Sequence, residues 1–116
     1  MTSDYTVQSH FDKCSPAVAA TYARILEASE KLGPYTEEPK KTSIHLVRRT
    51  AFAGIATRKT ALILTLKSER DLKSKRIAKH EQASANRWHL EIKLEGPEQI
   101  DSELVSWLER AYELAG

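Results

Sequence analysis

Cysteine and glycine are scarce in this sequence, and their scarcity excludes several familiar kinds of functional site. Cys14 is the single cysteine, so the chain cannot form an internal disulfide or a CxxC metal or redox pair. Glycine occurs only at positions 33, 54, 96 and 116, which leaves no GxGxxG or GxxxxGK(S/T) phosphate-binding loop. HExxH and GxSxG are absent as well. Nucleotide binding and hydrolysis by these motifs are therefore excluded.

Long hydrophobic runs are also missing. The longest clearly apolar run, residues 61–66, is far shorter than the ~20 residues that cross a bilayer. Residues 1–4 are polar and acidic, and they do not begin the pattern of a secretory signal peptide. We therefore expect no membrane partner and a cytoplasmic location, where a single free cysteine stays reduced.

The clearest pattern that is present covers residues 88–95. Trp88, Leu90, Ile92 and Leu94 alternate with polar residues, so the apolar side chains share one face of an extended chain. This alternation is typical of a half-buried strand, which needs neighbouring strands and a helical layer over its apolar face. A chain of 116 residues has the length of one domain and can bury such a core without a disulfide or a metal.

Two amphipathic helices are predicted to supply the helical layer. A Ser-Pro pair at residues 15–16 is typical of a helix start, and an apolar stripe predicts a helix over residues 16–32. The Gly-Pro pair at residues 33–34 ends this helix. Asp101 is the predicted N-cap of a second helix, whose apolar stripe continues to the end of the chain. A further short helix or strap is expected in residues 4–13.

Three short segments with alternating apolar residues predict a meander of antiparallel strands before residue 67. Residues 35–42 contain a proline and several charges and are expected to form a connector or a ragged edge strand. The face of the sheet away from the helices is more apolar than solvent exposure requires, so a loop, a second subunit or a ligand is expected to cover it. The apolar residues assigned to this open face are Val47, Ala53, Ile55 and Ile63.

Residues 67–87 form a basic connector in which only Leu72 and Ile77 are large and apolar. Acidic and basic residues four apart in this segment can pair along a helix surface, which predicts one or two exposed helical turns. The predicted fold is a single α+β domain over residues 1–116. An antiparallel sheet of about four strands is covered on one face by two helices, in the order α-α-β-β-β-basic connector-β-α.

The charges are segregated along the chain. Residues 40–93 hold 14 of the 18 Lys/Arg and 4 of the 16 Asp/Glu, so the middle is basic and the ends are acidic. The two parts could neutralise each other in the fold, or the middle could form a basic face for an anionic partner. Weak nucleic-acid binding through phosphates is possible, but no aromatic residue lies between Phe52 and Trp88 for base stacking. The candidate contacts for an anionic partner are Arg70, Lys73, Lys75, Arg76, Lys79 and Arg87.

His45, His89 and Glu91 are the candidate ligand-binding residues of the open sheet face. Each alternates with apolar residues of its predicted strand, so all three side chains should point away from the helices. Two imidazoles and a carboxylate could bind zinc or transfer protons. The alternative is that they are unconnected polar residues on separate strands. We expect no resident metal or cofactor and assign no catalytic residue, because no nucleophile, base and orienting group fall together.

Several features of the sequence, in their order along the chain, resemble an uncharacterised and mostly bacterial family, domain of unknown function 5655. The most specific of them are Arg87-Trp88-His89 at the start of the last strand and residues 107–112, which contain Trp-Leu and Ala-Tyr. The others are His10-Phe11, Leu32-Gly33-Pro34, Phe52, Arg76 and Asp101. The resemblance implies an α+β fold and association with other domains or partner proteins, and it implies no catalytic residues.

These observations favour a non-enzymatic binding or interaction module. The expected partner is anionic or a protein, which includes a second copy of the chain, and the basic connector and the open sheet face are the expected contact surfaces. The alternative is a small-molecule-binding or hydrolytic site around His45, His89 and Glu91.

Overall fold

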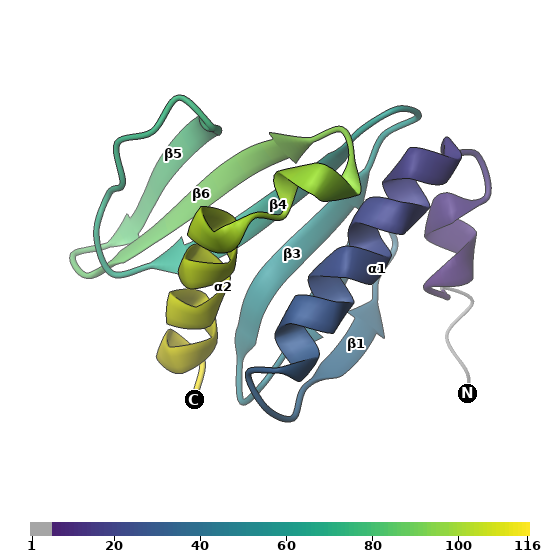
Figure 1. The fold of residues 1–116 in the computed structure, drawn as a ribbon. Helices are drawn as coiled ribbons and strands as arrows, with labels where there is room; N and C mark the ends of the chain where they lie inside the picture. The colour runs from purple at the N-terminus through teal and green to yellow at the C-terminus, as the bar shows by residue number, and fades with distance from the viewer. Residues whose placement is uncertain (1–5) are drawn as a thin grey trace.

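The computed structural model describes residues 6–116, in which two helices cover one face of a six-stranded sheet (Figure 1). The strands lie in the order β1-β2-β3-β4-β6-β5, and all neighbouring strands are antiparallel. None of the helices in this part of the chain is both long and apolar enough to cross a membrane. The elements are η1 (Gln8–Phe11), α1 (Pro16–Glu30), β1 (Thr36–Pro39), β2 (Ile44–Val47), β3 (Ala51–Thr57), β4 (Leu62–Ser68), β5 (Ile77–Ser84), β6 (Arg87–Leu94), η2 (Pro97–Gln99) and α2 (Ser102–Leu114).

The centre of the core is formed by β4 and β6, which place apolar residues opposite one another under the helices. The opposed pairs are Leu62 with Leu94, Leu64 with Ile92, and Leu66 with Leu90. Each of these six side chains is at most 2% exposed. Burial of one such side chain stabilises the fold by about 1.5–3 kcal/mol. The predicted α+β class, with an antiparallel sheet under two helices, is therefore confirmed.

The helix boundaries follow the signals in the sequence. Pro16 is the first residue of α1, and the carboxylate of Asp101 accepts a hydrogen bond of 3.0 Å from the backbone N–H of Leu104 at the start of α2. The first helix ends at Glu30, two residues before the predicted position. The expected short helix in residues 4–13 is the 3-10 helix η1, and residues 4 and 5 of that segment lie outside the described part of the chain.

The predicted number of strands was wrong, because the sheet has an additional strand at each edge. For residues 35–42 the sequence predicted either a connector or a ragged edge strand. The edge strand forms, as β1, and it ends at Pro39. The Tyr22 hydroxyl of α1 donates a hydrogen bond of 2.6 Å to Glu37 of β1. Burial of Tyr22, together with this hydrogen bond, raises the pKa of its hydroxyl above the ordinary tyrosine value.

The helical turns predicted for the basic connector do not form: residues 69–76 are irregular, and the strand β5 follows from Ile77. Of its eight residues only Ile77 is buried, so no alternation of apolar residues marks it as a strand. It forms because its backbone pairs with the exposed edge of β6. The acidic residues of the connector do not pair with lysines four positions away. Instead, Glu69 contacts Arg110 and Asp71 contacts His80.

The residues assigned to the open face also need a correction. The register of β2 and β3 shifts between Leu46 and Val47, and this irregularity leaves both Phe52 and Ala53 buried. Ala53 and Ile55 are therefore core residues, whereas Gly54 and the half-buried Ala56 lie on the open face. Trp88 packs against the core but is only half-buried.

The segment after α1 contacts α2 through Gly33 and Tyr112. Gly33 has a φ of +145°, and a Cβ at this position would lie 2.4 Å from the Tyr112 hydroxyl. That hydroxyl donates a hydrogen bond of 2.8 Å to the carbonyl of Pro34. Only glycine therefore allows the close approach that joins the end of α1 to α2.

We expect Gly33→Ala to lower the free energy of unfolding by about 2 kcal/mol, because alanine is strained at this φ and its methyl group displaces the Tyr112 hydroxyl. Urea denaturation monitored by circular dichroism measures the change. Gly54→Ala is the matched control, since a Cβ there makes ordinary contacts at 3.7 Å and 3.9 Å, and it should change the stability by less than about 1 kcal/mol. Equal losses in the two variants would contradict the role of Gly33.

Candidate functional site

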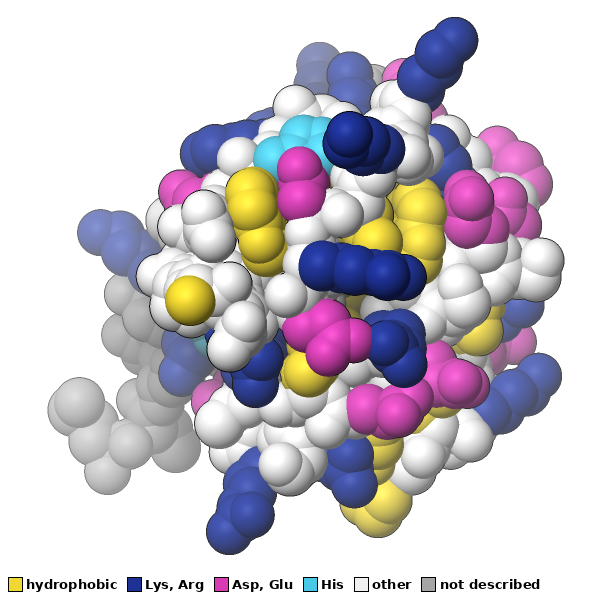
Figure 2. All heavy atoms as spheres, turned by 90° about the vertical axis from the view of Figure 1, so that its left-hand side faces the viewer, with side chains coloured by type: hydrophobic (Ala, Val, Ile, Leu, Met, Phe, Trp, Pro, Cys, Tyr) yellow, Lys and Arg dark blue, Asp and Glu magenta, His cyan; other side chains and the backbone are white. Residues whose placement is uncertain are grey.

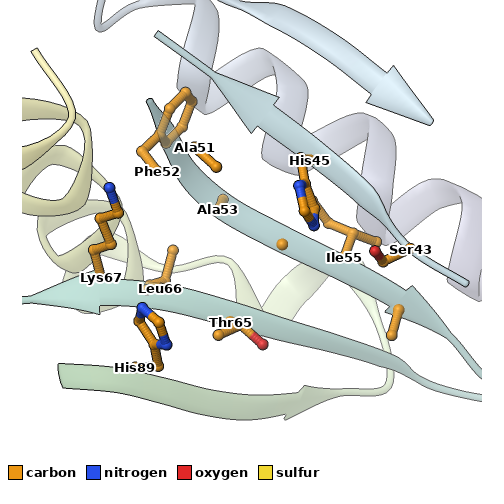
Figure 3. Close-up of a pocket in the computed structure, with 12 residues that line it drawn as sticks. Ser43, His45, Ala51, Phe52, Ala53, Ile55, Thr65, Leu66, Lys67 and His89 are labelled. Carbon is orange, nitrogen blue, oxygen red and sulfur yellow. The ribbon is translucent and has the colours of Figure 1, made fainter. Parts of the chain in front are cut away.

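A hollow of about 450 Å³ lies on the face of the sheet that the helices leave open (Figure 3). We call it the open-face groove. It follows β3, with β2 on one side and β4 and β6 on the other, and its floor includes the small residues Ala51, Gly54 and Ala56. The polar side chains around this floor are Ser43, His45, Thr65, Lys67 and His89.

The groove exists because small residues of β3 lie between larger residues of the neighbouring strands. Gly54 is paired with His45 on β2 and with Thr65 on β4. A Cβ at Gly54 would lie 3.7 Å from the Thr65 Cβ and 3.9 Å from the His45 ring, which is ordinary van der Waals contact. The backbone geometry therefore does not require glycine here, and its effect is to leave space between the two side chains.

The two candidate histidines line this same groove from opposite sides. Figure 3 shows His45 on one side of β3, and His89 with Lys67 on the other side. Because β3 and β4 separate β2 from β6, the strand backbones that carry the two histidines are about 14 Å apart, at a strand spacing of about 4.8 Å. They can contact the two ends of one ligand, but they cannot share a metal ion or a proton.

Glu91 is on the same face but does not line the groove. It is opposite Thr65 in the β4–β6 register, and its carboxylate lies 3.9 Å from the Lys79 amine on β5. His89 has a similar partner on β5, because its Nδ1 lies 3.8 Å from the Glu81 carboxylate. Within residues 6–116, no group of three or more His, Cys, Asp or Glu side chains is placed to hold a metal ion.

Lys67 is the residue of the groove that the sequence analysis did not single out. Its amine donates a hydrogen bond of 2.9 Å to the Thr50 hydroxyl. Lys67 forms no ion pair with a carboxylate of the described chain. Partial burial, with a smaller contribution from the charge of Arg87, lowers the pKa of Lys67 below the ordinary lysine value. The alternation of β4 could have revealed it, since Lys67 follows the buried Leu66 and must face the open side.

The basic connector does not present its charges as one uniform surface. Figure 2 views the molecule from the connector side and shows Lys and Arg side chains interspersed with Asp, Glu and hydrophobic side chains. Lys79 is next to Glu91, Arg87 is half-buried near Lys67, and Arg76 is held by acidic residues of α2. The remaining candidates, Arg70, Lys73 and Lys75, are exposed.

Arg76 fixes the connector to the start of α2. Its guanidinium donates to Asp101 at 2.8 Å, to Glu103 at 3.1 Å and to the Gln99 carbonyl at 2.5 Å. It also lies 5.7 Å from the ring centroid of Trp107. The hydrogen bond from Arg76 is the main reason why the pKa of Asp101 lies below the ordinary aspartate value. Arg76 is therefore a structural residue as well as a candidate partner contact.

The fold and the groove define an α+β domain with an open sheet face. The sequence profile of the family described as Domain of unknown function (DUF5655) matches residues 7–115. The chain belongs to this family, as the resemblance in the sequence indicated. No curated protein and no solved structure matches the chain significantly.

We expect Arg76→Gln to raise the pKa of Asp101 toward 3.8, which carboxyl NMR titration measures. The variant should also unfold more easily than the wild type. Because the folded-state pKa of Asp101 is lowered, this ion pair stabilises the fold above the unfolded-state pKa and is lost as the pH falls through the folded-state pKa. The stability difference should therefore be full at neutral pH and shrink below pH 3.8.

Lys75→Gln is the matched control, because Lys75 is exposed and forms no ion pair with any residue of the described chain. It removes the same charge from the same segment. An equal rise in the Asp101 pKa in both variants would show that general charge, and not the contact with Arg76, lowers it.

Proposed function

We propose that this domain is a non-enzymatic interaction module whose open-face groove binds an acidic segment of a protein partner. The observation that supports this proposal best is the charge of the groove lining. Lys67, His45 and His89 line the groove, and no Asp or Glu side chain of the described chain does so. A carboxylate entering the groove would meet the Lys67 amine and the two imidazoles, and the Glu81 carboxylate of β5 lies outside the lining, 3.8 Å from the His89 Nδ1.

Lys67 is the proposed main contact. An ammonium group has three N–H donors, and the Thr50 hydroxyl uses one of them in this structure. The lowered pKa of Lys67 reflects a site where its charge is incompletely solvated, so a carboxylate partner would stabilise the charged form. The small residues of β3 leave room for a side chain of the partner to reach this amine.

A protein segment fits the groove better than a nucleic acid. Phe52 is the one Phe, Tyr or Trp residue that lines the groove, and it is 1% exposed, so none of these larger rings is available there to stack on a base. The face shown in Figure 2 also mixes charges of both signs, which weakens a phosphate-only contact there.

The hydrolytic alternative has less support than binding. His45 and His89 are too far apart to act on one proton, and Glu91 is directed toward Lys79. His89 and Glu81 are 3.8 Å apart, but no serine, threonine or cysteine side chain is hydrogen-bonded to that histidine within the described chain. An activated nucleophile needs such a contact.

Fluorescence anisotropy with a labelled peptide of alternating Glu and Ala tests the proposal. The wild-type domain should bind this peptide more tightly than the matched Gln-Ala peptide, and the difference should decrease with salt. Lys67→Gln should weaken binding of the acidic peptide about 10-fold, because it removes the charge-assisted contact. Gly54→Leu should also weaken it, because the new side chain fills the groove.

Lys93→Gln is the control for Lys67→Gln, since Lys93 is exposed, lies on β6 and does not line the groove. It should change the affinity less than about 2-fold. Equal affinities for the Glu and Gln peptides, or equal losses in the two lysine variants, would overturn the proposal. Binding of free glutamate as tightly as the peptide would instead indicate a small-molecule site.

A further inference from the structure

A second hollow lies on the helix side of the sheet, at the flank of α2. Its volume is about 300 Å³, and residues 69, 70 and 72 of the connector border it. Leu66, Leu90 and Ile92 of β4 and β6 form its floor and are each at most 2% exposed. The large apolar side chains of its walls are only half-buried, and they are Leu72, Trp107 and Leu114.

The hollow forms because α2 does not reach across the whole sheet. The helix packs on β3 and β4, so the helix-side face of β6 is left to the connector. Trp107, Arg110 and Leu114 are spaced three, four and seven residues apart and therefore share the flank of α2 that faces this gap. The connector closes the gap through ion pairs from Glu69 to Arg110 and from Arg76 to Asp101 and Glu103 at the start of α2.

The rim of the hollow carries a carboxylate that is bound to an arginine. Glu69 accepts a hydrogen bond of 2.5 Å from Nη2 of Arg110. A guanidinium has five N–H donors and binds a carboxylate most strongly through two parallel hydrogen bonds. Arg110 makes this single side-chain contact within residues 6–116, so most of its donors are open to another acceptor. Arg70, also on the rim, forms no ion pair in that part of the chain.

We propose that this hollow binds a small monocarboxylic acid with an apolar body. The body would lie between Trp107 and the leucines of the floor. The ligand carboxylate would take the position of the Glu69 carboxylate on Arg110, with Arg70 as a second cationic contact. Arg110 has N–H donors beyond the one that Glu69 uses, and Arg70 lies on the same rim, so a carboxylate head group would gain charge-assisted hydrogen bonds that a neutral head group would not. The volume is at the lower end of the range for ligand pockets, about 300–1,000 Å³.

Tryptophan fluorescence in the Trp88→Phe background tests this proposal, because Trp107 is then the only tryptophan. The probe is octanoate, and 1-octanol is the neutral probe with the same chain length. Octanoate should change the Trp107 emission saturably and bind at least about 5-fold more tightly than octanol. Backbone amide shifts in NMR spectra should be confined to α2, the connector, β4 and β6.

Two variants with opposite expected effects identify the carboxylate site. Arg110→Gln should weaken octanoate binding about 10-fold and leave octanol unchanged. Glu69→Gln should tighten octanoate binding severalfold, because it removes the internal carboxylate that occupies Arg110. Arg49→Gln is the matched control for the charge change, since Arg49 is exposed and does not line the hollow. The side chains of Arg110, Glu69 and Arg49 are all exposed, and circular dichroism verifies that each variant is folded.

Equal binding of octanoate and octanol would overturn the proposal, as would an unchanged octanoate affinity in both Arg110→Gln and Glu69→Gln. The absence of a saturable change in the emission of Trp107 would do the same. The outcome is distinguishable from that of the open-face groove, because Glu69 and Arg110 do not line that groove, although Leu66 and Lys67 border both hollows.

Discussion

The pairing of β4 with β6 is the interaction on which the rest of this structure depends. Its register opposes leucine and isoleucine residues on the helix side, and on the other side it opposes Thr65 with Glu91 and Lys67 with His89. A shift by one residue would put the polar set under the helices, where each unpaired polar group costs about 1–3 kcal/mol. The register is therefore fixed by burial, and it places Lys67 and His89 side by side at the open-face groove.

The parts of the fold that were predictable from sequence are those with a strong apolar period. Residues 90, 92 and 94 alternate clearly, and α2 has both a stripe and an N-cap at Asp101, so their structure follows from local signals. β5 lacks such a signal, since only Ile77 is buried and its pairing with β6 depends on the rest of the sheet. The bulge near Phe52 is equally hidden, because it changes which of two adjacent apolar residues face the core.

The candidate site was predictable only in part for a related reason. Alternation places His45, His89 and Glu91 on one face, and the structure agrees with that placement. Their spacing depends on the strand order, which the sequence does not reveal. The groove itself arises because Gly54 and Ala56 lack large side chains. Small residues do not stand out in a pattern of alternating apolar and polar residues, so the sequence does not predict the groove. Lys67 was overlooked because it falls where a strand was expected to end.

The two hollows differ in what holds their walls in place. The open-face groove is built on β2, β3 and β4, whose positions are fixed by buried apolar residues and ladder hydrogen bonds. The hollow beside α2 is bordered by the connector, which buries little and is attached by ion pairs such as Arg76 with Asp101. Ion pairs at the surface weaken with salt, whereas apolar burial does not. The walls of the groove are therefore held mainly by apolar burial, whereas the connector wall of the second hollow is held by ion pairs that Arg76 and Glu69 form with residues at α2.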